Sequence, residues 1–213
     1  MKKLNELNLR GFFSLFKTEK PNRTQTKSSY HRTLLEMDKS KVICLDIETT
    51  GLDIHNDEIV QLSIIDGNNN VLFNDYIKPE RKISWKDAEK IHGISPKMVK
   101  NKYTLREVLP YINSILENAE CIVGYNSNGF DIPFLQAKGV IFPNELTTEY
   151  VDVMKDFAII YGEWSDFFCD WKWQKLEKCA KFYGYNFNPH DSLEDVKATL
   201  FCHYKICERY AKI

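Results

Sequence analysis

The sequence lacks several features that would assign it to a special class of protein. No apolar run is long enough to span a bilayer. There is no secretory signal, because the apolar stretch at 11–16 is short and no small-residue cleavage site follows it. The six cysteines include no C-x-x-C pair, so we interpret them as reduced, mostly buried thiols. We therefore expect a cytoplasmic protein that makes no contact with a membrane.

The sequence also lacks an excess of charge of one sign, since its net charge is −1. The charge is nevertheless unevenly distributed along the chain. Residues 1–41 contain ten Lys or Arg and four Asp or Glu, a net +6, whereas the rest contains nineteen and twenty-six, a net −7. Residues 17–29 are polar, as in a linker, and follow an apolar helical face formed by Leu9, Phe12, Phe13 and Phe16. We predict a basic extension at 1–39 and one domain at 40–213. The extension is either a solvated tail or a segment that contacts nucleic acid or a partner protein.

From about residue 40 the periodicity of the sequence predicts ordered elements. Strands are expected at 41–47, 58–65, 68–77 and 120–126, with the second and third forming an antiparallel hairpin. Helices are expected at 84–93, 104–119, 130–139, 172–184 and 192–212, and residues 150–162 mix strand and helix signals. Three strands followed by alternating helices and strands predict an α/β domain with a mixed sheet.

Two acidic residues interrupt the end of the first apolar strand. Asp46 and Glu48 are two positions apart, so on a strand they share one face. Two ionised carboxylates at this spacing repel, and burying them without a partner costs several kcal/mol. A hard divalent cation such as Mg²⁺ or Mn²⁺ would resolve the conflict. The alternative is a D-x-E tripeptide in a solvated loop.

Three further polar residues lie at the ends of other predicted elements. Taken alone, Asp131 is better explained as the N-cap of the helix that follows, and Ser192 to Asp195 resembles a capping box. His190 enters the last helix five residues before Asp195. Taken together, four acids and an imidazole that titrates near neutral pH are the groups needed for two-metal phosphodiester hydrolysis.

These segments resemble the three motifs of the DnaQ-like DEDDh 3′–5′ exonucleases. The matching stretches are DIETTGL (46–52), GYNSNGFDIPFL (124–135) and HDSLEDV (190–196), together with KIHGIS (90–95). The spacing from His190 to Asp195 is that of the His subtype. The resemblance covers residues 40–210 in the expected order. It implies a ribonuclease H-like fold, in which a five-stranded mixed sheet (strands 1–3 antiparallel, later strands parallel) is flanked by helices.

The resemblance also implies roles for individual residues. Asp46, Glu48, Asp131 and Asp195 would bind two divalent cations, Mg²⁺ or Mn²⁺, with Asp46 shared between them. His190 would take the proton from the attacking water. Leu52 would wedge against the terminal base, Phe130 would line the same pocket, and His92 would lie near the 3′ end. The backbone amides around Thr49 and Thr50 would position the terminal nucleotide, and Asn126 of the second motif would also bind the substrate.

Three departures from the family pattern concern the shape of the substrate site rather than its metal chemistry. Tyr125 replaces a His that often precedes Asn126, the loop to Asp131 is one residue longer than in short members, and Ser192 replaces a frequent Ala. We predict a 3′–5′ exonuclease acting on the 3′ end of a nucleic acid, with DNA favoured over RNA, in proofreading or repair. A DNA polymerase or another replication or repair protein would be its partner through residues 1–39. The alternatives are an exoribonuclease and a non-catalytic nucleic-acid-binding or polymerase-binding module.

A cluster of aromatic residues follows the segment with mixed signals. We expect it to form an apolar cluster under the last helices, with base stacking as the alternative. Its members are Trp164, Phe167, Phe168, Trp171 and Trp173.

Overall fold

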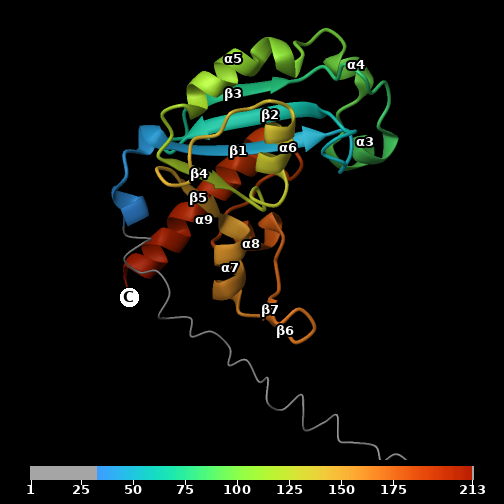
Figure 1. Cartoon of the computed structure of the whole chain (residues 1–213). Coiled ribbons are helices and arrows are strands. Elements are labelled where there is room, and N and C mark those ends of the chain that lie inside the picture. Colours follow the sequence, from blue (N-terminus) through green and yellow to red (C-terminus); the bar gives the residue numbers. More distant parts are fainter. Residues whose placement is uncertain (1–32, 213) are drawn as a thin grey trace, which may run out of the picture.

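A computed structural model describes residues 33–212 (Figure 1). The predicted apolar face at residues 9–16 and the linker at 17–29 lie outside the described residues. The described chain begins with a helical turn at 33–36 that places Leu34 in the core, where only 2% of it is exposed. A short 3₁₀ helix, η1 (Lys39–Lys41), then leads into the first strand.

The central sheet has five strands in the order β3-β2-β1-β4-β5. β1 (Val42–Thr49) pairs antiparallel with β2 (Ile59–Asp66), which pairs antiparallel with β3 (Val71–Tyr76). On its other side β1 runs parallel to β4 (Cys121–Gly124), and β4 runs parallel to β5 (Glu149–Asp152). This confirms the predicted mixed sheet, with antiparallel strands first and parallel strands later.

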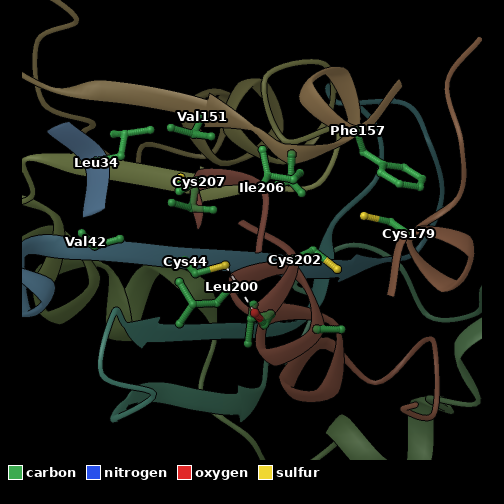
Figure 2. Packing of buried hydrophobic residues seen from close by; sticks show 14 of the residues in the cluster. Leu34, Val42, Cys44, Val151, Phe157, Cys179, Leu200, Cys202, Ile206 and Cys207 are labelled. Carbon is green, nitrogen blue, oxygen red and sulfur yellow. Dashed lines mark hydrogen bonds between the residues drawn. The ribbon is translucent and has the colours of Figure 1, made fainter. Parts of the chain in front are cut away.

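The alternation of side chains along β1 assigns its residues to two cores. Val42 and Cys44 face a core shared with α7 (Val153–Tyr161), α8 (Leu176–Phe182) and α9 (Ser192–Ala211). Figure 2 shows this core, in which Cys44, Leu200 and Cys202 pack together. Ile43, Leu45 and Ile47 face the opposite core, which α5 (Leu105–Leu116) and α6 (Asp131–Ala137) cover. By the same period of two, Asp46 and Glu48 belong to the face covered by α9.

Local signals explain where the helices begin and end. α3 (Lys86–His92) ends at Gly93 in the left-handed conformation, with φ 75°. α4 (Pro96–Val99) follows it, and α5 begins at Thr104, which forms a capping box with Glu107. Pro110 lies inside α5 without ending it. The mixed segment divides at Asp152, which ends β5 and caps α7 by accepting a hydrogen bond from the Met154 N–H. None of the helices described between residues 33 and 212 is long and apolar enough to cross a membrane.

The aromatic cluster only partly forms the predicted apolar core. Trp164 and Trp171 pair edge to face across a short hairpin, β6 (Trp164–Ser165) and β7 (Asp170–Trp171), with ring centroids 5.1 Å apart. In contrast, Phe167 and Phe168 in the turn and Trp173 after β7 are 87%, 76% and 60% exposed. The prediction of burial was wrong for these three, because Phe167 and Phe168 pair with each other in the exposed turn, 4.8 Å between ring centroids, and Trp173 lies beyond the short strand β7.

Candidate active site

The carboxyl end of β1 and the start of α9 meet at the candidate site. Cys44 Sγ, on the α9 face of β1, lies 3.5 Å from the Val196 carbonyl (Figure 2). The Ser192 hydroxyl, at the start of α9, hydrogen-bonds the Ser63 hydroxyl of β2 at 2.6 Å. These contacts fix the first turn of α9 against the sheet, and that turn carries Asp195.

Three of the four predicted acids are gathered tightly at this junction. Asp46, Glu48 and Asp195 each offer a carboxylate oxygen, and these oxygens all lie within 4.8 Å of one another. Asp46 and Glu48 are half-buried, and Asp195 is buried. Such a group of oxygens is what a hard divalent cation requires.

Asp131 lies beside this group and approaches from the opposite layer of helices. It is the first residue of α6 and is 4% exposed. The alternative that Asp131 is an N-cap is wrong, since Phe130 occupies that position without a side-chain cap hydrogen bond. Instead, Asp131 Oδ1 accepts a hydrogen bond of 3.1 Å from the Ile47 N–H, which lies between Asp46 and Glu48. The strand backbone therefore orients the fourth carboxylate.

The capping box expected at Ser192 is also wrong. The N-cap of α9 is Asp191, whose side chain accepts from the Leu193 N–H at 3.0 Å. Because Asp191 takes the capping role, the Asp195 carboxylate remains directed toward the other acids.

Burial raises the pKa of all four carboxyl groups. The pKa rises to about 8 for Glu48 and to about 7 for both Asp131 and Asp195. The pKa of Asp46 rises well above its ordinary range, because burial is reinforced by the neighbouring charges of Asp131 and Asp195. Among the described residues, no Lys or Arg forms an ion pair with any of these four groups. The site thus has an uncompensated demand for positive charge.

His190 lies at the rim of the acidic group. Its backbone has φ 68° and its side chain is exposed. The His190 N–H donates to Asp195 Oδ2 at 3.0 Å. The residue is therefore tied to the site through its backbone while its imidazole faces solvent.

His92 connects the end of α3 to the end of β1. Its Nδ1 accepts from the Ile94 N–H at 3.0 Å, so the ring proton lies on Nε2, which donates to the Thr49 carbonyl at 3.2 Å. Burial lowers the pKa of His92, although the hydrogen bond to Thr49 and the charge of Glu89 raise it. The hydrogen bond that Nδ1 accepts fixes the tautomer of the neutral ring.

The segment after β1 contains the other residues predicted to contact a substrate. Leu52 is 84% exposed, as an apolar wedge requires. The Thr50 N–H already donates to the Glu58 carbonyl at 2.8 Å, so this amide is not available to a nucleotide, and its predicted role was wrong. Thr49 is buried, and its hydroxyl donates to the Gly51 carbonyl at 2.6 Å.

The loop between β4 and α6 is organised by Asn126. This residue has φ 60°, and its carbonyl accepts from the N–H groups of Gly129 and Phe130 at 3.0 and 3.1 Å. Phe130 is half-buried and packs against Phe134, with ring centroids 5.5 Å apart. The loop therefore sets the position of Phe130 immediately before the Asp131 carboxylate.

Two of the departures from the family pattern make structural contacts. The Tyr125 hydroxyl donates to the Gln174 carbonyl at 2.7 Å, which ties the end of β4 to the start of α8. Ser192, fully buried, forms the bond to Ser63 described above.

The sequence reasoning missed Asp152, a fifth acid at this edge of the sheet. Asp152 Oδ1 accepts from the Asn126 N–H at 2.9 Å, whereas Oδ2 is buried and has no hydrogen-bond partner among the described residues. The pKa of Asp152 is raised by burial, and its charge contributes to raising the pKa of Asp131. The signal was present, since Asp152 ends an apolar strand just as Asp46 interrupts one.

With this geometry in view, the chain can be compared with known proteins. The model of the family described as Exonuclease matches residues 43–201. The chain belongs to the exonuclease family. This confirms the predicted resemblance to the DnaQ-like exonuclease family.

The curated relatives include DNA polymerases that are much longer than this chain. The DNA polymerase III PolC-type of Thermotoga petrophila is 41% identical over 97 residues, which are 44% of this chain and 7% of the relative. The PolC-type polymerase of Caldanaerobacter subterraneus subsp. tengcongensis is 27% identical over 179 residues, 82% of this chain and 12% of the relative. The chain therefore spans roughly a tenth of the length of these relatives.

Solved structures share the exonuclease fold. A zinc-bound complex of E. coli exonuclease I with single-stranded DNA superposes with a TM-score of 0.64 at 22% identity. The match covers 81% of this chain and 41% of exonuclease I. At this identity the likeness supports the fold alone.

Proposed function

We propose that this chain is a metal-dependent 3′–5′ exonuclease that hydrolyses DNA at a single-stranded or frayed 3′ end and releases nucleoside 5′-monophosphates. The observation that carries the proposal is the gathering of the Asp46, Glu48 and Asp195 oxygens within 4.8 Å of one another, next to the buried Asp131 carboxylate. Proofreading or repair is the proposed role, because the relatives are DNA polymerases III.

The residues at the site fit two hard divalent cations, Mg²⁺ or Mn²⁺. The donors are carboxylate oxygens only, and their raised pKa values reflect a negative charge that no nearby Lys or Arg of the described residues neutralises. Asp46, Glu48 and Asp195 would hold one ion, and Asp131 would hold the second, with Asp46 shared. When bound, such ions supply positive charge at the scissile phosphate and favour ionisation of a water molecule.

The side chains of the site have separate roles in the proposed reaction. The water oxygen forms a bond to the terminal phosphorus, and the bond from phosphorus to the 3′ oxygen of the preceding nucleotide breaks. His190, in its neutral form, accepts the proton of the attacking water, which its exposed position at the rim allows.

The substrate contacts follow from the exposed and fixed groups around the acids. Leu52 would wedge against the terminal base, and Phe130 would line the pocket below it. The neutral His92 would contact the 3′ end while holding the Thr49 carbonyl in place. A mismatched or single-stranded end is favoured, because unstacking a paired terminus costs a few kcal/mol more.

The proposal is tested by incubating the protein with 5′-labelled DNA and RNA 12-mers of the same sequence, first in EDTA and then with increasing concentrations of Mg²⁺. We expect a ladder of products shortened from the 3′ end, faster with DNA, and no ladder with Asp46→Asn. Faster cleavage of RNA would favour an exoribonuclease. No product from either strand in Mg²⁺ or Mn²⁺ would leave only a non-catalytic binding module.

Residues 1–39 are proposed to contact a DNA polymerase or another replication or repair protein, or to add affinity for nucleic acid. Since Leu34 is buried in the core, a truncation that tests this should end at Arg32 rather than at Lys39. Loss of residues 1–32 removes eight Lys or Arg and two Asp or Glu. An unchanged salt dependence of DNA binding would assign the extension to a protein partner or to a linker. A cytoplasmic location remains a prediction.

A further inference from the structure

A surface pocket of about 350 Å³ is lined by basic and apolar side chains together with the carboxylates of Glu58 and Glu80. It forms where the segment after β3 meets the start of α5 and the end of α6, on the sheet face that α5 and α6 cover. Its apolar lining residues are Ile59, Ile77, Leu105 and Leu109. Its basic lining residues are Lys78, Arg81, Arg106 and Lys138.

Two of these cations converge on one backbone oxygen. Arg81 Nη2 and Lys138 Nζ both donate to the His55 carbonyl, at 3.2 and 3.4 Å. Lys138 Nζ also lies 5.2 Å from the centroid of the Phe134 ring. Burial lowers the pKa of Lys138 and the neighbouring Arg81 lowers it further, whereas the charges of Glu58, Asp57 and Asp53 raise it. The two cations repel each other, and an anion bound between them would reduce that repulsion.

The carboxylates closest to this pair are already engaged. Glu58 accepts from three successive backbone N–H groups, those of residues 80–82, at 2.6 to 2.9 Å. Glu80 pairs with Arg106 at 2.6 Å, and Asp57 pairs with Lys82 at 3.0 Å. Between residues 33 and 212, no carboxylate lies within ion-pair distance of Arg81 or Lys138.

The pair is connected to the candidate active site through two segments. α6 begins with Asp131 and ends just before Lys138, so these residues are separated by about 10 Å at 1.5 Å per residue. The loop after β1 carries the exposed Leu52 and, three residues later, the His55 carbonyl. A strand stacked at about 3.4 Å per nucleotide would cover the distance along α6 in about three nucleotides.

We propose that Arg81 and Lys138 form a phosphate-binding subsite for the backbone of the substrate strand, a few nucleotides before the scissile bond. This inference rests on the proposed function, since it assumes a strand whose 3′ end lies at the acids. The phosphodiester is an oxyanion without a base requirement, so the subsite contributes affinity for any sequence. The domain, although acidic overall, would then bind the DNA strand at two places: at the catalytic acids with their cations, and at Arg81 and Lys138.

The double variant Arg81→Gln/Lys138→Gln tests the subsite. Binding of a labelled DNA 12-mer is measured against salt concentration with Ca²⁺ in place of Mg²⁺, under conditions where no product forms. For single strands each phosphate contact contributes about 0.7 to the slope of log K against log salt, so loss of this one contact should lower the slope by about 0.7. A matched control, Lys181→Gln/Lys212→Gln, removes two exposed charges from α8 and the end of α9, on the opposite face of the sheet. Its slope should equal that of the wild type.

A second readout separates this subsite from the active site. Hydrolysis of the 4-nitrophenyl ester of thymidine 5′-monophosphate, which occupies only the terminal position, should be within twofold of the wild-type rate. Wild-type protein inactive on both the ester and the 12-mer would refute the proposed function instead. An unchanged slope in an active, folded double variant would overturn the subsite.

Discussion

The Asp195 carboxylate accepts a hydrogen bond from the backbone N–H of His190 at 3.0 Å. One of the acids proposed to bind a cation therefore also fixes the residue proposed to act as the base. The left-handed backbone conformation of His190, with φ 68°, lets the chain turn so that the His190 N–H reaches the Asp195 carboxylate. Acid and base are consequently coupled in position, although the imidazole itself remains exposed.

Removing the charge of Asp46 should abolish activity without weakening the fold. Asp46→Asn removes the group at the centre of the acidic cluster and with it the repulsion from Asp131 and Asp195. We expect no measurable hydrolysis in Mg²⁺ and, at pH 8 in EDTA, a midpoint of urea unfolding equal to or above that of the wild type. Wild-type activity in this variant would show that the site is wrongly assigned.

The metal-free protein should lose stability as the pH rises. The pKa values of Asp131 and Asp195 are raised from 3.8 to about 7, and that of Glu48 from 4.5 to about 8, so the folded state binds more protons. Their contribution is fully present below the unfolded pKa values and is lost as the pH passes through about 7 to 8. Urea unfolding in EDTA should give a lower free energy of unfolding at pH 8.5 than at pH 5.5. Mg²⁺ should recover much of the loss at pH 8.5, and a flat profile in EDTA would contradict the shifts.

Replacing His190 should reduce the rate of hydrolysis while leaving DNA binding intact. His190→Ala removes the proposed base, so kcat should fall by about 10²- to 10⁴-fold, while DNA binding in Ca²⁺ is retained. Single-turnover cleavage of a labelled DNA 12-mer in Mg²⁺ and binding of the same strand in Ca²⁺ measure the two effects. A variant that keeps the wild-type kcat would show that another group is the base.

The cysteines should differ sharply in reactivity. Cys169 is exposed, whereas the other five are buried, and burial raises the pKa of Cys44, Cys121 and Cys207. A thiol reagent such as DTNB should modify one thiol per native chain and six after unfolding in guanidinium. A Cys169→Ser variant, as the control, should show none in the native state.

The glycine at the end of β4 should not tolerate a side chain. A Cβ at Gly124 would lie 2.3 Å from both Cβ and Oγ of Ser127, in the loop that leads to Asp131. Gly124→Ala should therefore destabilise the fold by about 1–3 kcal/mol, the usual cost of overpacking. Because the buried Ser127 hydroxyl has no hydrogen-bond partner within residues 33–212, Gly124→Ala/Ser127→Gly should recover part of this loss. Thermal unfolding and activity of both variants would measure the clash.

Much of the site could be predicted from local rules. The period of two along β1 placed Asp46 and Glu48 on one face, and the order of the motifs identified Asp131, Asp195 and His190. Helix signals correctly predicted that α3 ends at Gly93. The boundary between β5 and α7 could not be predicted, because Asp152 both ends the strand and caps the helix. The N-cap of α9 could not be predicted from the sequence, since Ser192 and Asp191 are both good N-cap residues. The packing of Ser192 against Ser63 leaves the role to Asp191.

The sequence by itself determined the first four strands of the central sheet, most of the helices and the identity of four of the acids, because these depend on periodicity and on residue type at element ends. Only the tertiary structure decided how residues distant in the chain meet. It brought the Asp131 carboxylate to the Ile47 amide across 84 positions, and Lys138 to the His55 carbonyl across 83. Such contacts follow from the packing of α6 against the sheet, which no local pattern specifies.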